Sequence, residues 1–158
     1  MNDRWSAGRA ILYATLVVGI LDGLDAVLFF YFRSGAAPAR IFQGIAAGLL
    51  GRTAALQGGA ATALLGVALH FFIASGVVAI FLLASRLAPV LIRHPLAFGV
   101  LYGLAVYVVM NDVVIPMSAI GARATPTPLP VLVNGLLIHA FGVGVPAALV
   151  ARAAARRG

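Results

Sequence analysis

The chain contains no cysteine, no lysine and no glutamate among its 158 residues. The absence of cysteine excludes disulfides, thiolate nucleophiles and cysteine-ligated zinc or iron–sulfur centres. Charged residues make up only 9% of the chain, whereas 63% of its residues are hydrophobic. Soluble globular domains are about 45–50% apolar, so a water-soluble fold of this length would lack the polar residues to cover its surface. The composition therefore predicts an integral membrane protein.

The few charges that are present are mostly positive, with eleven arginines against four aspartates and a net charge of +7. Such an excess can indicate nucleic-acid binding. Here the arginines are separated by long apolar runs and form no basic patch interleaved with aromatic residues. Arginines that flank apolar runs set the topology of membrane proteins. We therefore expect membrane lipid, and no nucleic acid, as a partner.

Four apolar runs are each long enough to cross a hydrocarbon core of about 30 Å. They cover residues 10–32, 60–85, 96–117 and 131–151. Residues 41–51 are apolar but too short to span, which favours a short interfacial or re-entrant helix between spans one and two. Three prolines within residues 126–130 predict a non-helical loop before span four. The expected fold is an all-α, four-transmembrane-helix bundle forming a single membrane domain over residues 1–158.

Arginine counting favours a cytoplasmic location for both termini in a bacterial inner membrane. That orientation puts seven arginines inside and four outside. The inner set is Arg4, Arg9, Arg86, Arg93, Arg152, Arg156 and Arg157, and the outer set is Arg33, Arg40, Arg52 and Arg123. The first apolar run resembles a signal peptide in its basic start, but it is too long and is interrupted by an aspartate, so we interpret it as a membrane anchor.

Every span carries ionisable or amide side chains inside its apolar run. Such groups are costly in a bilayer and usually face the interior of the bundle. At about 1.5 Å per residue, Asp22, His70 and His139 reach similar depths in the outer half of the membrane, and Asn111 and Asp112 lie nearer its outer face. We therefore expect a buried polar cluster there. Its predicted members are Asp22, Asp25, His70, Asn111, Asp112 and His139.

Small residues recur on the same helical faces as these polar groups, at spacings of three, four or seven. Small residues at such spacings let membrane helices pack closely. The predicted helix-packing glycines are Gly19, Gly66, Gly99, Gly103, Gly135 and Gly142.

Three functions are compatible with the buried cluster. The first is a small proton-linked transport or binding module, in which Pro116 and Pro146 act as hinges. In the second, His70 and His139 ligate haem b or a divalent metal, although no metal or cofactor is required by any specific motif. In the third, the protein is a non-catalytic membrane assembly or partner protein, and the polar groups only fix helix register through hydrogen bonds.

An enzyme is not expected. The sequence contains no nucleophile–base constellation, no HExxH and no GxSxG, so no catalytic residue is assigned. Four short spans make a small transporter, which leaves a homo-oligomer as an option.

Residues 60–157 resemble the YagU-type bacterial inner-membrane proteins, a family of unknown biochemical activity. The resemblance is carried by the Gly66–His70 helix running into LLASRLAP, by NDVVIPMSAIG at the end of span three, and by His139 followed by the arginines of residues 152–157. It implies a small multi-span inner-membrane protein. The chain departs from the family at Asn111, where a histidine is expected.

Overall fold

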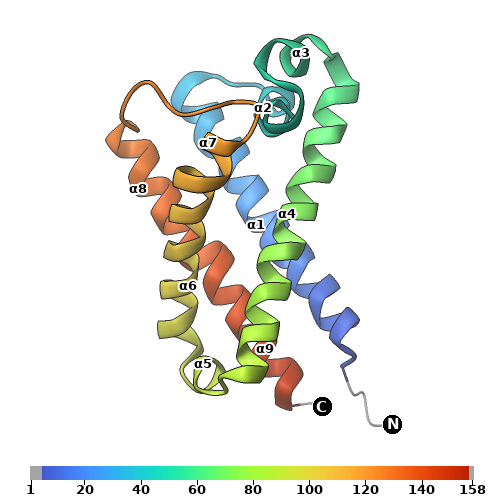
Figure 1. The fold of residues 1–158 in the computed structure, drawn as a ribbon, viewed down its shortest axis with the longest axis vertical. Helices are drawn as coiled ribbons and strands as arrows, with labels where there is room; N and C mark the ends of the chain where they lie inside the picture. Colours follow the sequence, from blue (N-terminus) through green and yellow to red (C-terminus); the bar gives the residue numbers. More distant parts are fainter. Residues whose placement is uncertain (1–4, 157–158) are drawn as a thin grey trace.

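A computed structural model of the chain describes residues 5–156, and the described part contains helices and no strand. Arg4 and Arg157, which entered the arginine count, lie outside the described residues. Within this part, four helices are long and apolar enough to cross a membrane. They run along the long axis of the molecule (Figure 1) and confirm the expected all-α bundle.

Each of the four helical spans is longer than the apolar run from which it was predicted. Helix α1 covers Ala7–Ser34 and α4 covers Gly59–Leu87. Span three joins α6 (Pro95–Val109), η1 (Met110–Val114) and α7 (Ile115–Met117). Span four joins α8 (Leu129–Ile138), η2 (His139–Gly144) and α9 (Val145–Arg156).

Local signals set several of these helix ends. Helix α1 starts after Ser6, whose side-chain oxygen accepts a hydrogen bond from the Arg9 backbone N–H at 3.2 Å, as N-cap serines do. It ends at Gly35, which adopts a left-handed conformation with φ of 68°. Prolines occupy the first turns of the helices that begin at Pro38 and Pro95, where a missing N–H costs nothing.

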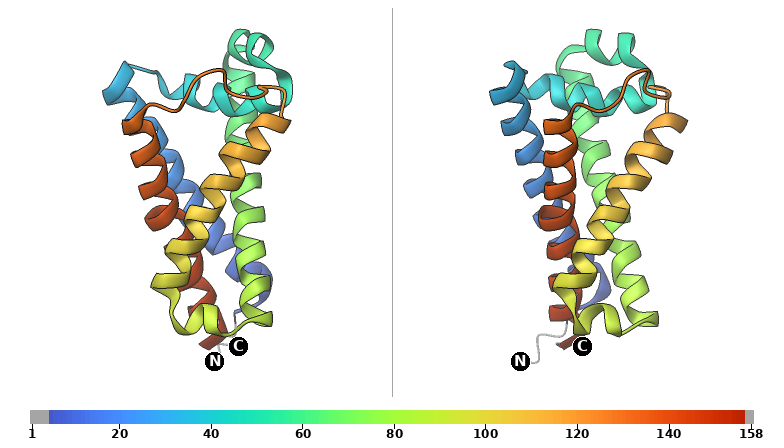
Figure 2. Two further views of the ribbon diagram at one scale, coloured as in Figure 1. Left: turned by 60° about the vertical axis from the view of Figure 1, so that its left-hand side comes forward. Right: turned by 90° about the vertical axis from the view of Figure 1, so that its left-hand side faces the viewer.

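The expected short helix between spans one and two is present, and a second one follows it. Helix α2 covers Pro38–Leu50 and α3 covers Arg52–Gln57. Helix α2 lies crosswise to the long helices over one end of the bundle (Figure 2), which is the arrangement of an interfacial helix. The side chain of Gln43 fixes it there, because its buried amide donates a hydrogen bond to the Gly59 carbonyl at 2.9 Å.

The two ends of the bundle differ. The long helices converge at the end that carries both described chain ends and the short helix α5 (Val90–Arg93), and they splay apart toward α2 (Figure 2). Small residues fill the narrow half, where Ala14, Val78 and Ala147 are completely buried. The narrow half is therefore the packed core of the fold, and the splayed half has room for a cavity.

Candidate functional site

A cavity of about 220 Å³ lies in the splayed half, between the four spans and beneath α2. We call it the inner cavity. Its polar lining consists of Asp22, His70, Asn111 and His139, one residue from each span. The rest of its wall is apolar, and Ile45 contributes the surface of α2. Four of the six predicted cluster residues are thus brought together around one space.

The ring of His70 is held in a defined tautomer. Its Nε2 lies 2.8 Å from the carbonyl oxygen of Gly19 in the neighbouring helix. A carbonyl can only accept, so Nε2 carries a proton and donates it. Phe42 of α2 and Phe71 contact the ring edge-on, at centroid distances of 6.2 and 5.4 Å. These contacts leave Nδ1 as the nitrogen that faces the cavity.

The nitrogen Nδ1 of His70 faces the carboxylate of Asp22, with 3.9 Å between Nδ1 and Oδ2. Only 11% of the His70 side chain and 26% of the Asp22 side chain are exposed. If Nδ1 of His70 and the Asp22 carboxylate both lacked a proton, the Nδ1 lone pair would face a carboxylate in a place with little water, which is unfavourable. One proton on either partner removes this repulsion. The gap exceeds a direct hydrogen bond, so a water molecule or a small ligand can bridge it.

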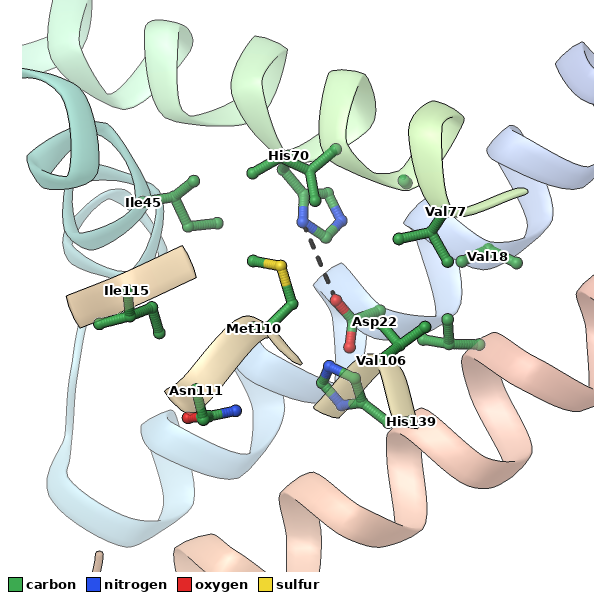
Figure 3. Close-up of a pocket in the computed structure, with 13 residues that line it drawn as sticks. Val18, Asp22, Ile45, His70, Val77, Val106, Met110, Asn111, Ile115 and His139 are labelled. Atoms are coloured by element: carbon green, nitrogen blue, oxygen red, sulfur yellow. Dashed lines mark ion pairs between the residues drawn. The ribbon is translucent and has the colours of Figure 1, made fainter. Parts of the chain in front are cut away.

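His139 approaches the same carboxylate from span four. Its Nδ1 donates to the Gly135 carbonyl one turn earlier, at 2.9 Å, which leaves Nε2 as the nitrogen that can accept a proton. Tyr107 contacts the ring edge-on at a centroid distance of 5.3 Å. Figure 3 shows Asp22 between the two imidazole rings. The arrangement is a carboxylate flanked by two histidines whose orientations are fixed by backbone carbonyls.

A second cavity of about 280 Å³ adjoins the first and reaches the exposed loop before α8. We call it the outer cavity. Asp25 lies here, and its Oδ2 accepts a hydrogen bond of 2.7 Å from the Asn134 side-chain amide. Asp22, Asn111 and His139 line both cavities. These three side chains therefore form the wall between the inner and outer cavities.

Arg123 lies at the loop end of the outer cavity. Its guanidinium donates to the Asn111 side-chain oxygen at 2.8 Å and also contacts the Thr127 hydroxyl. The amide nitrogen of Asn111 donates to the Tyr107 carbonyl at 2.9 Å. Asn111 therefore links the exposed loop to the wall between the cavities.

Both Asn111 and His139 belong to π-helical turns. In η1 the Ile115 N–H bonds to the Met110 carbonyl, and in η2 the Val145 N–H bonds to the Ala140 carbonyl. A proline follows each of the two N–H donors, as Pro116 after Ile115 and Pro146 after Val145. Because a proline ring crowds the carbonyl four residues before it and supplies no N–H, it favours the wider turn. Such turns often occur at functional sites, and here both carry a cavity-lining side chain.

The predicted packing glycines lie where a side chain has no room. A Cβ at Gly66 would overlap the Phe42 backbone, and one at Gly103 would overlap the His139 carbonyl. Gly99 faces the backbone of residues 144–145, while Gly19 and Gly135 face the side chains of Phe71 and Tyr107 on other spans. Gly142 differs, because its nearest obstacle is the side chain of Ile138, one turn earlier in its own span. Gly144, which the sequence reasoning missed, makes one of the closest approaches, against the Gly99 carbonyl.

The structure changes the predicted polar cluster at two positions. Asp112 is exposed and lines neither cavity, so its expected place in the buried cluster is wrong. Asn111 lines the cavities, and the next residue of a helix is turned by about 100° from it, which here places the Asp112 side chain on the exposed surface. Asn134 was not among the predicted cluster residues, yet its side-chain amide donates the hydrogen bond to Asp25. Its position opposite a carboxylate on another span could not be read from one helix alone.

The geometry does not favour haem ligation by the two histidines. His70 already uses Nε2, the nitrogen best placed at the tip of the ring, for its hydrogen bond to the Gly19 carbonyl. Within residues 5–156, no three His, Cys, Asp or Glu side chains converge as a metal site requires. The arrangement suits proton exchange or hydrogen bonding to a small polar molecule.

Comparisons of the chain with protein-family models, with curated proteins and with solved structures find no match. The geometry of the two cavities is therefore what indicates a function for this protein.

Proposed function

We propose that this protein is a small bacterial inner-membrane module that takes up and relays protons, alone or with one small polar solute, through the inner cavity. The observation that carries the proposal is the Asp22 carboxylate placed between His70 and His139 in a largely buried space. A carboxylate and two imidazoles are groups that exchange protons readily, and intramembrane groups of this kind mark proton and substrate pathways. In each step an N–H or O–H bond of one group breaks while the acceptor forms the new one, and no covalent intermediate is needed.

The surroundings of the site support access from one side. The outer cavity extends from the inner cavity to the exposed Arg123, whereas Ala14, Val78 and Ala147 are completely buried in the packed narrow half. Transport would need a second conformation that opens the narrow half. The π turns beside Pro116 and Pro146 provide backbone that can change its hydrogen bonding during such a transition.

Proton flux into vesicles tests the proposal. The protein is reconstituted into liposomes that contain a pH-sensitive dye, and a potassium diffusion potential drives proton entry. We expect wild-type protein to raise the flux above that of empty vesicles, and Asp22→Asn to return it to the empty level. Asp112→Asn is the matched control, because it makes the same chemical change at an exposed carboxylate outside both cavities.

The outcomes separate a proton function from a structural one. All variants are first compared by size-exclusion chromatography in detergent, so that a loss of flux is not a loss of folded protein. If wild type and Asp22→Asn both match empty vesicles while Asp22→Asn unfolds more easily, the polar groups serve only helix packing. In that case the alternative of a non-catalytic assembly protein is favoured.

We also propose that both termini are cytoplasmic. The end with the described chain ends carries Arg9, Arg86, Arg93, Arg152 and Arg156, and the α2 end carries Arg33, Arg40, Arg52 and Arg123. The bias agrees with the positive-inside rule. Because the chain lacks cysteine, one introduced thiol is an unambiguous reporter. An impermeant maleimide should label Ala124→Cys in intact cells and His94→Cys only after permeabilisation; the reverse pattern would invert the topology.

A further inference from the structure

A basic pocket lies at the narrow end of the bundle, far from the inner and outer cavities. Its volume is about 370 Å³, and its charged lining consists of Arg93 from α5 and Arg152 and Arg156 from α9. Helices α5 and α9 contact each other there. The pocket is therefore built by two segments that are separated by about a third of the chain.

The three guanidinium groups have no partner among the described residues. None of them forms a hydrogen bond or an ion pair within residues 5–156, and Arg152 is nevertheless partly buried. The three described aspartates all lie toward the splayed half, on α1 and η1. The positive charge of this pocket is thus not neutralised by any described carboxylate, and an anion would fill that role.

The apolar surroundings indicate what kind of anion. Leu149 lies one turn before Arg152 on the same face of α9, and it is 45% exposed. On α6, Leu96 is 62% exposed, just after the α5 turn. An apolar surface that ends in arginines at the level of the head groups matches a molecule with an acyl chain and an anionic head. Basic pockets of this kind between transmembrane helices bind anionic lipid head groups.

We propose that Arg93, Arg152 and Arg156 bind the phosphate of an anionic phospholipid, with its acyl chain along the exposed face of α9. The guanidinium fork suits phosphate oxygens. This lipid site is independent of the proposed proton function, because it shares no residue with either cavity.

Native mass spectrometry of the detergent-solubilised full chain tests the site. Phosphatidylglycerol should remain bound, whereas phosphatidylcholine at the same concentration should not. Each arginine near the membrane surface contributes about 1 kcal/mol, so Arg93→Gln combined with Arg152→Gln should weaken the phosphatidylglycerol Kd about 30-fold. Arg33→Gln combined with Arg52→Gln is the control, because it removes the same charge at the opposite end and should leave the Kd unchanged.

Three results would overturn the proposal. Equal affinity for the two lipids in wild-type protein would show that the pocket does not recognise negative charge, and this comparison needs no variant to fold. An equal loss in the control variant would show a general charge effect. Displacement of the lipid by an equal concentration of inorganic phosphate would show a site for free phosphate rather than for a phospholipid.

Discussion

Replacing Gly103 with alanine tests the closest helix contact of the site. Gly103 of α6 lies against the start of η2, and a Cβ there would overlap the carbonyl of His139 and the Cα of Ala140. Both obstacles are backbone atoms, which cannot rotate away as the tip of a side chain can. The two helices must therefore separate locally. Such overpacking costs about 1–3 kcal/mol.

The free energy of unfolding of Gly103→Ala contains a second contribution. Alanine is favoured over glycine inside a helix by about 0.5–1 kcal/mol, which offsets part of the loss. Gly76→Ala in α4 isolates this contribution, because no atom lies within 4 Å of the position a Cβ would take there. Gly76→Ala should be neutral or slightly stabilising. The difference between the two variants should then be about 1–3 kcal/mol, the overpacking cost alone.

The measurement is unfolding by sodium dodecyl sulfate in mixed micelles, followed by circular dichroism. Gly103→Ala should unfold at a lower detergent fraction than wild type, and Gly76→Ala at an equal or higher one. Proton flux should fall with Gly103→Ala, because the displaced backbone belongs to His139. Equal unfolding free energies for the two variants would refute the proposed contact between α6 and η2.

Three further predictions concern single hydrogen bonds. Asn134→Ala removes the 2.7 Å bond to Asp25 and should lower the free energy of unfolding by about 0.6 kcal/mol, the average for such bonds between membrane helices; no change would mean that the bond is not formed. Nitrogen NMR should show His70 protonated at Nε2, as its bond to the Gly19 carbonyl requires, and a proton on Nδ1 alone would contradict it. Gln43→Ala should cost about 1 kcal/mol and speed hydrogen exchange in α2, whereas unchanged exchange would show that Gln43 does not hold this helix.

The sequence predicts the spans well because bilayer thickness sets a minimum length that only four runs meet. It also predicts that residues 41–51 cannot span, and the structure lays α2 across the bundle end. It is harder to predict on which face of its helix each residue lies. Stripes counted at 3.6 residues per turn fail where a π turn adds a residue, as in η1 and η2. Asp112 and Gly144 both lie in such turns, which explains why their roles were not predicted correctly.

Contacts between spans are the other part that the sequence does not determine. Depth counting places Asp22, His70 and His139 at one level, but it does not say which nitrogen of each ring faces the carboxylate. That choice depends on the carbonyls of Gly19 and Gly135. The Gly19 carbonyl lies on a different helix from His70, so only the packed bundle determines which nitrogen of this ring faces the carboxylate.

The glycines that let these helices approach one another also explain how polar groups are tolerated between them. In hydrocarbon, an imidazole without hydrogen-bond partners would cost several kcal/mol. Glycines have no side chain to screen their carbonyls, so a ring can reach the backbone of Gly19 across the helix interface. Each histidine then has one nitrogen satisfied by the fold and one directed to the cavity. The close packing therefore does more than stabilise the bundle, because it fixes which nitrogen of His70 remains available for a proton or a ligand, while the helix of His139 does the same for its own ring.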